Sequence, residues 1–428
     1  MAVTTQTAPA ASSVVSAQAT VQRPNMRALM SRITRDQGPE FEQTLPFINT
    51  TQQVTPTSLK TDRKISLYQI HVKGRITVGA SPVTFRSGPP LLGTPLFSLI
   101  QNFFFNGQHQ RYGAQTPINM RGESAAEMFT LMTSDYEPFY RVSVNGATPV
   151  QQGALSGAAN ATNDFEFIIP VPMFPMGINP AEQSFWALHG PDWPGNWFFT
   201  VLPADPTALG VTLASLANGG AVTAYGSSSG NGTIDILSER PLLGKTLAGN
   251  VRPGITFRTT NSQQPTAVAN GSSQAGSGAD IFDANVGKDT TRFFVKAGTQ
   301  LASTSSGVIV YGTLSDGIFT QTFFSLDSRA LRFQGANRDA CLQDYMARAY
   351  GRAVPIGYKA IDFVMNRAGG PANPKAAFPS TKLTAARKFQ VNADTVSASN
   401  QIAEVVQEYT LGRPGFSGTT PAASTPAA

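Results

Sequence analysis

Alternating apolar and polar positions predict a chain built mostly from short β-strands. Residues 65–67 alternate in one phase and residues 70–78 in the opposite phase, so a β-bulge is expected near Tyr68 and Gln69. Roughly seven to nine strands per half, separated by turns, favour two antiparallel β-sandwiches over a βαβ architecture. Further strands are expected at 96–105, 138–145, 164–171, 196–202, 209–214, 233–237, 254–259, 291–296, 307–314, 318–326, 358–365, 381–391 and 402–411.

One pattern occurs twice along the chain. The first copy consists of an apolar strand at 96–100, a turn at 106–107 and a short amphipathic helix at 122–132. The second copy has a strand at 322–326 and a helix at 336–350. Each helix is the only convincing one in its half. Duplication of a mostly β unit indicates a building role rather than catalysis.

Composition divides the chain into four parts. Residues 1–60 are an N-terminal extension, of low complexity at first and then basic and amphipathic. Residues 61–225 and 226–412 each form one β unit, separated by a turn-rich passage, and residues 413–428 form a tail. Both termini are expected to be flexible. The chain has no secretory signal at its start and no apolar stretch of roughly 18 residues, which favours synthesis in a cytoplasm.

Charge is scarce in this protein. Only 14% of the 428 residues are charged, against roughly 25% in typical soluble domains. Surfaces poor in Lys and Glu are often covered by other subunits, although an extracellular β-sandwich has the same composition. The net charge of +6 is too small over this length to indicate nucleic-acid binding. The single cysteine, Cys341, excludes an intrachain disulfide and is interpreted as a small buried residue.

No motif for catalysis or cofactor binding is present. Hydrolase and metalloprotease signatures are absent, and His71, His109 and His189 are far apart in the sequence. The segment that starts at Gly244 resembles the end of a P-loop, but Glu239 stands where the motif needs its first glycine. We therefore expect no enzyme activity, no cofactor and no metal site.

A basic segment near the N-terminus is a candidate for contact with a membrane or with the inner face of an assembly. Residues 23–35 would form about two helical turns, with apolar side chains on one side. Such a segment can lie on an anionic membrane, dock on a neighbouring subunit or pack against its own domain. Its basic residues are Arg23, Arg27, Arg32 and Arg35.

The three tryptophans form the second candidate group. Trp186, Trp193 and Trp197 lie in one short segment. If exposed, their rings would stack on sugars. At a subunit interface they would anchor the contact, because Trp is enriched at interface hot spots. In a third interpretation they cap one end of a sandwich core, and the sequence leaves all three open.

Several segments follow one another in a specific order. In the first half these are Val-Lys-Gly-Arg-Ile-Thr-Val-Gly-Ala (72–80), Pro-Leu-Phe-Ser-Leu-Ile-Gln (95–101), a glycine-led helix, Phe-Glu-Phe-Ile-Ile-Pro-Val-Pro (165–172) and Leu-Pro-Ala-Asp-Pro-Thr-Ala-Leu (202–209). In the second half they are Tyr-Lys-Ala-Ile-Asp-Phe-Val-Met (358–365), Lys-Leu-Thr-Ala-Ala-Arg-Lys-Phe-Gln-Val (382–391) and Ile-Ala-Glu-Val-Val-Gln-Glu-Tyr-Thr-Leu (402–411). Over about residues 60–412, this order resembles the double jelly-roll major capsid proteins of icosahedral, membrane-containing phages (tectivirus-like or corticovirus-like).

The resemblance implies a mainly β fold of two consecutive eight-stranded antiparallel jelly-roll barrels, each with one short helix, and flexible termini. It implies a structural major capsid protein whose pseudo-hexagonal trimers tile the icosahedral shell of a virion made in a host cytoplasm. The implied partners are other copies of the chain, minor capsid or vertex proteins and, through the N-terminal segment, an internal viral membrane. Sequence-specific nucleic-acid binding is not implied. The alternative is a tandem β-sandwich that binds carbohydrate or a receptor, as a spike or lectin does.

Overall fold

The structure of the protein is a computed structural model that describes part of the chain. The described residues are 40–47, 57–82, 95–110, 113–122, 124–125, 142–146, 155–174, 183–195, 197–203, 222–224, 232–241, 258–262, 266–267, 279–284, 288–299, 309–315, 320–321, 358–362, 387–393 and 401–411.

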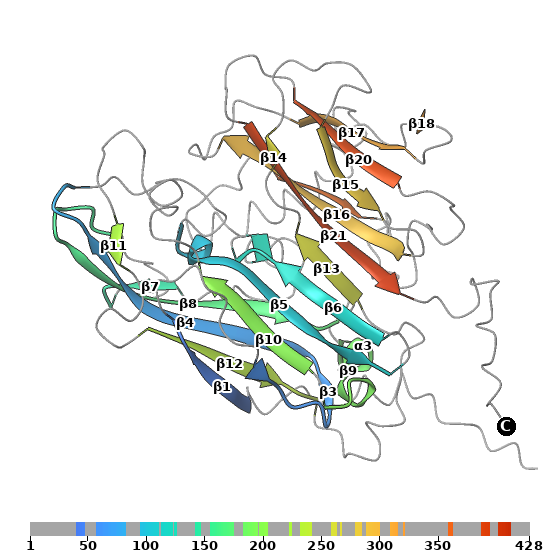
Figure 1. Cartoon of the computed structure of the whole chain (residues 1–428), viewed down its shortest axis with the longest axis horizontal. Helices are drawn as coiled ribbons and strands as arrows, with labels where there is room; N and C mark the ends of the chain where they lie inside the picture. The colour runs from blue at the N-terminus through green and yellow to red at the C-terminus, as the bar shows by residue number, and fades with distance from the viewer. Residues whose placement is uncertain are drawn as a thin grey trace, which may run out of the picture.

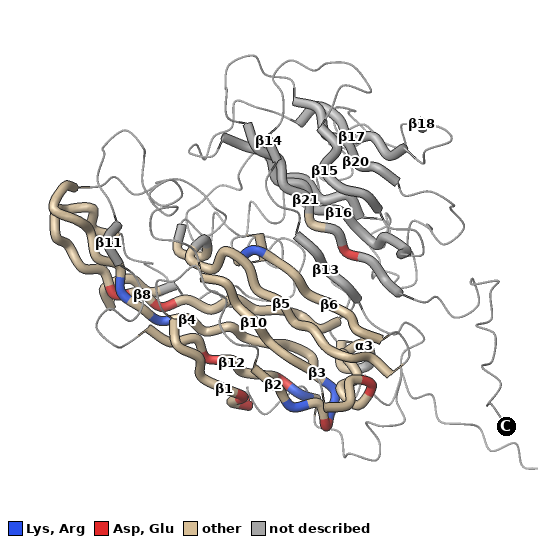
Figure 2. The backbone as a smooth tube through the Cα atoms, in the orientation of Figure 1, with Lys and Arg blue, Asp and Glu red and all other residues tan. Residues whose placement is uncertain are grey.

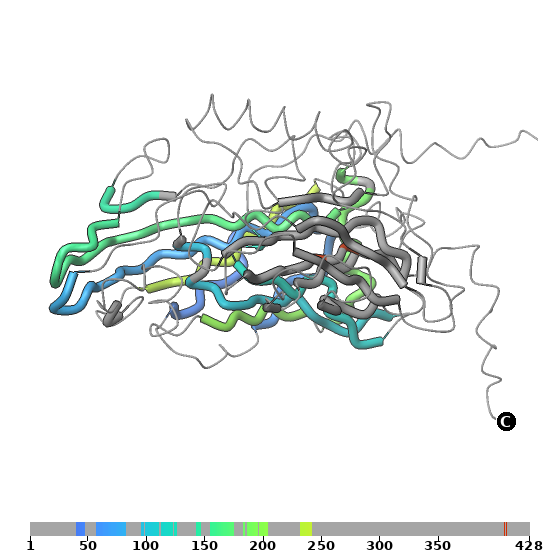
Figure 3. The backbone as a smooth tube through the Cα atoms, turned by 90° about the horizontal axis from the view of Figure 1, so that it is seen from above, coloured from blue at the N-terminus to red at the C-terminus, as the bar shows by residue number. Residues whose placement is uncertain are grey.

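Eight strands of the first half form two facing sheets, which lie in separate layers (Figures 1 and 3). One sheet has the order β1-β12-β4-β8 and the other the order β2-β10-β5-β6. Numbered one to eight along the chain, the strands therefore lie in the orders 1-8-3-6 and 2-7-4-5, which is jelly-roll connectivity. The strands are β1 (Glu40–Pro46), β2 (Thr57–Ser58), β4 (Leu67–Val78), β5 (Ile100–His109), β6 (Gly113–Met120), β8 (Thr162–Pro172), β10 (Trp197–Pro203) and β12 (Thr233–Glu239).

The second half repeats this connectivity. Its sheets have the orders β13-β21-β16-β19 and β15-β20-β17-β18, which again read 1-8-3-6 and 2-7-4-5 along the chain. The strands are β13 (Arg258–Ser262), β15 (Ala279–Ala284), β16 (Lys288–Thr299), β17 (Ile309–Ser315), β18 (Thr320–Gln321), β19 (Tyr358–Asp362), β20 (Arg387–Ala393) and β21 (Gln401–Leu411). Three short strands add to these sheets: β7 (Val142–Val144) on β8, β11 (Val222–Ala224) on β4 and β14 (Thr266–Ala267) on β21.

One parallel pairing joins the two halves. β13 pairs with β6 through Thr260 and Ile118, so a single nine-stranded sheet contains strands of both halves (Figure 1). All other described pairings are antiparallel. Val406 of β21 belongs to the same buried cluster as the core of the first half. The halves are therefore joined by both backbone and side-chain contacts.

The core of the first half lies between its two sheets. In β4 every second side chain, including Tyr68, Ile70 and Val72, is buried, as strand periodicity requires. Rings from both sheets meet in this layer: Tyr68 stacks on Phe105 with centroids 4.6 Å apart. Each such side chain contributes about 1.5–3 kcal/mol when it is fully buried. Aromatic packing between the layers therefore holds the sheets face to face.

The bulge predicted near Tyr68 and Gln69 is wrong. β4 pairs with β8 and with β12 in unbroken register through these residues. The alternation of apolar residues changes phase at Ser66 because two separate strands meet there. β3 (Lys64–Ile65) pairs with β9 (Leu188–His189), whereas β4, which follows Ser66, belongs to another sheet. The Ser66 amide still donates to the Glu239 carbonyl at 2.9 Å, so the hydrogen bonding continues across the break.

The segment from 95 to 107 also differs from expectation. Pro95–Leu99 is a 3-10 helix, η1, and the strand begins only at Ile100. Consecutive buried apolar residues do not distinguish helix from strand by periodicity. Residues 106–107 lie inside β5 and form no turn. The extra residue of a bulge lies opposite them in β6, near Pro117, which has no amide to donate.

The helix predicted at 122 does begin there. Residues 122, 124 and 125 are helical, and the Ala125 amide donates to the Arg121 carbonyl at 2.9 Å. Glycine is needed at 122 because a Cβ would lie 2.4 Å from the Phe97 carbonyl oxygen. The remainder of this helix, the predicted strand at 209–214 and the predicted helix at 336–350 with Cys341 lie outside the described residues, as do both termini.

Three strands of the first sandwich lie outside the range predicted for the first unit. β1 and β2 precede residue 61, and β12 follows residue 225, yet β12 is inserted between β1 and β4. The turn-rich passage before β12 therefore connects two strands of one sandwich. In a jelly roll the last strand lies between the first and the third, and local composition carries no trace of that long-range pairing.

Candidate functional site

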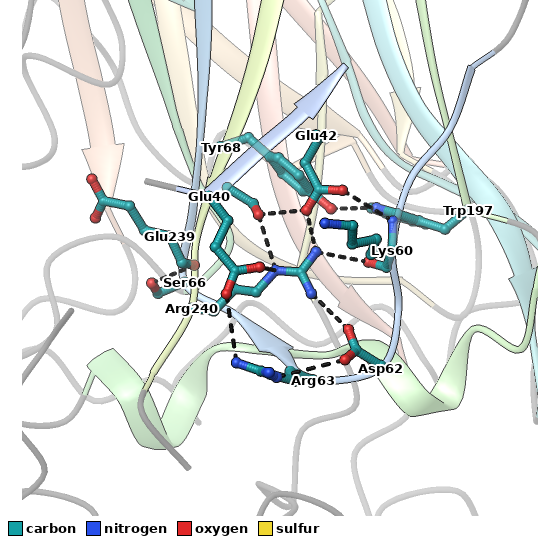
Figure 4. Close-up of polar contacts among 11 residues, drawn as sticks. Glu40, Glu42, Lys60, Asp62, Arg63, Ser66, Tyr68, Trp197, Glu239 and Arg240 are labelled. Atoms are coloured by element: carbon teal, nitrogen blue, oxygen red, sulfur yellow. Dashed lines mark hydrogen bonds and ion pairs between the residues drawn. The ribbon is translucent and has the colours of Figure 1, made fainter. Parts of the chain in front are cut away.

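A cluster of charged side chains gathers where the first sandwich ends and the chain leaves for the second half (Figure 4). At its centre is Arg240, which directly follows β12 and whose side chain is only 2% exposed. Its guanidinium donates to Asp62 Oδ1 at 2.7 Å and to Ser238 Oγ at 2.9 Å, and it also donates to Glu42 Oε1. Glu40 lies 3.7 Å away. Arg240 thereby joins three segments that are distant in the sequence: the start of β1, the loop at Asp62 and the end of β12.

Glu42 reaches Arg240 because of a β-bulge. The register between β1 and β12 shifts between Phe41 and Gln43, so Glu42 is the extra residue of β1. A bulge turns the side chain of the extra residue away from the regular alternation. The Glu42 carboxylate accepts from Ser238 Oγ at 2.6 Å and from the Lys60 amide at 3.3 Å, and its side chain is 1% exposed.

The cluster is partly shielded from water, which raises the cost of breaking it. Removing one partner of a buried ion pair leaves an uncompensated charge and costs about 3–5 kcal/mol. Arg63, by contrast, is 36% exposed and lies 3.5 Å from Glu40, so its pair is worth much less. Neither Arg240 nor Glu42 is recognisable from the sequence, because no local pattern marks residues that meet across such a separation.

The three tryptophans lie in the core of the first sandwich. Trp186, Trp193 and Trp197 are 5%, 1% and 0% exposed. Trp197 Nε1 donates to the Tyr68 hydroxyl at 2.9 Å, and burial raises the pKa of Tyr68, which keeps that hydroxyl protonated at neutral pH. Within one chain the three rings therefore offer little surface to a ligand or a neighbour, and their role at a subunit interface stays a prediction.

A buried lysine was not anticipated from the sequence. Lys64 of β3 has no exposed surface, and its Nζ donates to the Ser184 carbonyl at 3.4 Å. Burial lowers the pKa of Lys64 to about 7, and the charge of Asp192 opposes this shift. His189 is the backbone partner of Lys64, and its Nδ1 lies 3.2 Å from Asp192 Oδ2. Lys64, His189 and Asp192 thus form a small polar cluster inside the protein.

The outer face of the sheet β1-β12-β4-β8 carries a row of polar side-chain contacts. His71 lies between two carboxylates, with Nε2 2.6 Å from Glu166 and Nδ1 3.6 Å from Asp235. Further along, Arg75 binds Asp164 at 2.6 Å and 3.1 Å, and this hydrogen-bonded pairing lowers the pKa of Asp164. His71 therefore has structural partners on two neighbouring strands.

The remaining expectations concern ligands and membranes. The described residues contain no group of three or more His, Cys, Asp or Glu side chains that could hold a metal ion. No helix in the described ranges combines the length and apolar character needed to span a bilayer. The basic residues Arg23, Arg27, Arg32 and Arg35 lie outside the described residues, so their role stays a prediction.

Comparisons with known proteins concern the fold. No protein-family model matches the sequence, and a search of curated proteins finds no match. The crystal structure of the STIV MCP, from Sulfolobus turreted icosahedral virus, aligns with a TM-score of 0.50 at 13% identity, covering 87% of this chain and 97% of that one. The PBCV-1 virus capsid aligns with a TM-score of 0.50 at 9% identity, covering 89% and 96%.

These coverages include both halves of the chain, so the likeness extends to the double jelly-roll architecture and not to a single sandwich. The Faustovirus major capsid protein also aligns, with a TM-score of 0.48 at 10% identity over 88% of this chain and 90% of that one. The narrower resemblance to tectivirus-like or corticovirus-like phage proteins stays a prediction. By its fold, the chain is similar to capsid proteins that consist of two jelly rolls.

Proposed function

We propose that this chain is the major capsid protein of an icosahedral virus, a structural subunit of the virion shell without enzyme activity. The observation that carries the proposal is the repeated strand order: each half has its strands in the orders 1-8-3-6 and 2-7-4-5. The alignments with the STIV and PBCV-1 capsid structures over nearly the whole of each chain support it.

The architecture suits a shell subunit for physical reasons. A jelly roll places most strand edges inside its two sheets and offers broad flanks for lateral contact. Three chains, each with two such units side by side, give six similar flanks and hence a pseudo-hexagonal trimer. Several contacts of modest area then add up to stable assembly without one very tight interface.

The finer parts of the proposal concern boundaries and partners. We place the first jelly roll at 40–239 and the second at 258–411, with flexible segments before and after; the first contains more than the one short helix expected, because α3 (Gln183–Trp186) is present besides the helix that begins at 122. The trimers would contact one another and minor capsid or vertex proteins. Residues 23–35 would lie on the inner side of the shell against an internal membrane, as in membrane-containing phages.

Particle size is the test of this function. The purified full-length chain is expected to run as a trimer in gel filtration with light scattering, and to form larger shells or sheets in negative-stain images. A chain that stays monomeric at high concentration and binds immobilised glycans would contradict the proposal and favour the receptor-binding alternative. Under that alternative the glycan would have to be bound by other residues, because Trp186, Trp193 and Trp197 are buried.

Membrane contact can be tested separately. Changing Arg27, Arg32 and Arg35 to Glu should reduce flotation with anionic liposomes, since each basic residue near the surface contributes about 1 kcal/mol. The matched control changes the same three residues to Lys, which keeps the charge and should float like the wild type. Equal flotation of the Glu and Lys variants would contradict the membrane contact and leave the capsid function untouched.

A further inference from the structure

The two sheets of the first jelly roll differ sharply in charge. The strands β2, β5, β6 and β10 contain no Asp, Glu, Lys or Arg at all, although 14% of the whole chain is charged. Figure 2 shows β5 and β10 without any charged position, whereas charged positions lie on β4, β8 and β12. The facing sheet carries eight charged residues on its four strands: Glu40, Glu42, Lys73, Arg75, Asp164, Glu166, Asp235 and Glu239.

Alternation along the strands shows which uncharged residues face outward. In β5, Phe103 and Phe105 are buried in the core, so Phe104 between them points away from it and is half-buried. In β10 the outward positions are Phe198, Thr200 and Leu202, of which Phe198 and Leu202 are half-buried and Thr200 is only 1% exposed. Phe104 pairs directly with Thr200 across the two strands.

Amide side chains complete this outer face. Asn102 Nδ2 donates to Asn119 Oδ1 at 2.8 Å, which links β5 to β6 on the outward side. Gln108 follows on the same side of β5 and is exposed. The face therefore combines partly covered apolar side chains with neutral hydrogen-bonding groups. That composition, rich in aromatic residues and depleted of charge, is typical of the centre of a permanent protein interface.

We propose that the outer face of β10, β5 and β6 is the surface that contacts a second copy of this chain within the trimer, an inference that rests on the proposed function. The lack of charged side chains on this face favours a second copy of the chain over nucleic acid or lipid as the partner. Nucleic acid and anionic lipid need basic side chains on the surface they bind, and this face has none. An uncharged protein surface needs no counter-charge, and the subunit of a shell meets other copies of itself at the highest local concentration.

The charged outer face of the opposite sheet supplies the contrast. Its carboxylates and basic groups already pair within one chain, as Arg75 does with Asp164. Covering these groups would cost desolvation of charges, whereas covering the amides and rings of β5 and β10 costs far less. The two faces of one jelly roll are thus suited to different surroundings.

The test compares a substitution on the proposed surface with the same substitution at an exposed position elsewhere on the chain. Gln108 in β5 and Gln43 in β1 are both exposed, so Gln108→Lys and Gln43→Lys add the same charge without disturbing the core. Light scattering of the full-length chain across a concentration series should show trimers for the wild type and for Gln43→Lys. For Gln108→Lys the dissociation constant of the trimer should be at least about tenfold larger than for the wild type. The reason is that burying an unpaired charge in the interface costs more than about 1.4 kcal/mol.

The variant Phe104→Lys with Gln108→Lys extends the test, with circular dichroism to confirm that the sheets are folded. This pair of changes should give only monomers. Trimers of wild-type stability in both Gln108→Lys and the double variant would overturn the proposed surface while leaving the capsid function in place. A wild-type chain that never forms trimers would overturn the capsid function itself, and the surface with it.

Discussion

The carboxylate of Glu42 lies against the guanidinium of Arg240, although the two residues are 198 positions apart in the sequence. Glu42 belongs to the first strand of the first jelly roll, and Arg240 directly follows the last. Their contact therefore closes the sandwich at the point where the chain continues into the second half. Because both side chains are almost completely buried, the pair is expected to act as a clasp on this end of the fold.

The clasp can be tested by removing one charge at a time. Arg240→Met and Glu42→Gln should each lower the free energy of unfolding by about 3–5 kcal/mol, since each leaves a buried charge or polar group without its partner. The double variant should lose less than the sum of the single variants. Urea denaturation followed by tryptophan fluorescence measures this, because the three tryptophans lie in the same sandwich.

The control for the clasp is Arg63→Met, which removes an exposed charge beside the same cluster. Its effect should stay within about 1 kcal/mol. Strictly additive losses in Arg240→Met with Glu42→Gln would show that the two residues do not stabilise the fold through each other.

Lys64 predicts a dependence of stability on pH. Its pKa is about 7 in the folded chain and 10.5 in the unfolded chain, so between these values the unfolded state binds more protons. The free energy of unfolding should therefore rise with pH across this window, by at most about 1.4 kcal/mol per unit. Below pH 7 both states are protonated and the contribution of Lys64 becomes constant.

Lys64→Met should remove that slope and raise stability at pH 7, where the buried amine is costly. Urea midpoints at pH 7, 8 and 9 measure the effect, with Lys73→Met as the control, because Lys73 is 47% exposed. Identical slopes for the wild type and Lys64→Met would contradict the lowered pKa.

The hydrogen bond between Trp197 and Tyr68 should be measurable by substitution. Tyr68→Phe leaves the buried indole N–H of Trp197 without its acceptor and should cost about 1–3 kcal/mol. Trp197→Phe in the Tyr68→Phe background removes the orphaned donor, so the further loss should be smaller than in the wild type. Thermal unfolding of the four proteins gives this comparison, and equal losses in both backgrounds would exclude a contribution from the hydrogen bond.

Gly122 predicts intolerance of any side chain. A Cβ at this position would lie 2.4 Å from a backbone oxygen and 2.8 Å from Ile100 Cβ, so neither neighbour can move without displacing η1 or β5. Gly122→Ala should therefore lower stability by about 1–3 kcal/mol even though alanine favours helix. An unchanged unfolding midpoint would show that the helix shifts freely at its first residue.

Strand positions were largely predictable because alternation is a local property. The predictions at 164–171, 196–202 and 402–411 correspond closely to β8, β10 and β21. The predictions were wrong where consecutive residues in the sequence are all buried, because alternation is then lost. Leu96 and Phe97 are both fully buried, so η1 could not be told from a strand, and the burial of Ile65 and Leu67 imitated a change of phase.

Long-range pairing was not predictable from local pattern. Nothing in residues 233–239 indicates that they insert between strands at 40–46 and 67–78, and the turn-rich passage before them looked like a boundary between units. The burial of Lys64 and Arg240 could not be predicted for the same reason, since their partners come from distant segments. The resemblance to double jelly-roll proteins supplied the architecture that alternation alone could not give.

The central position of β12 also determines when the first half can fold during translation. β1 leaves the ribosome early, yet its only described neighbour, β12, is not synthesised until nearly 200 residues later. Until then the nascent chain exposes an open gap beside β4, with unpaired backbone groups on both sides. We expect this interval to be the period in which the growing polypeptide most needs protection by chaperones.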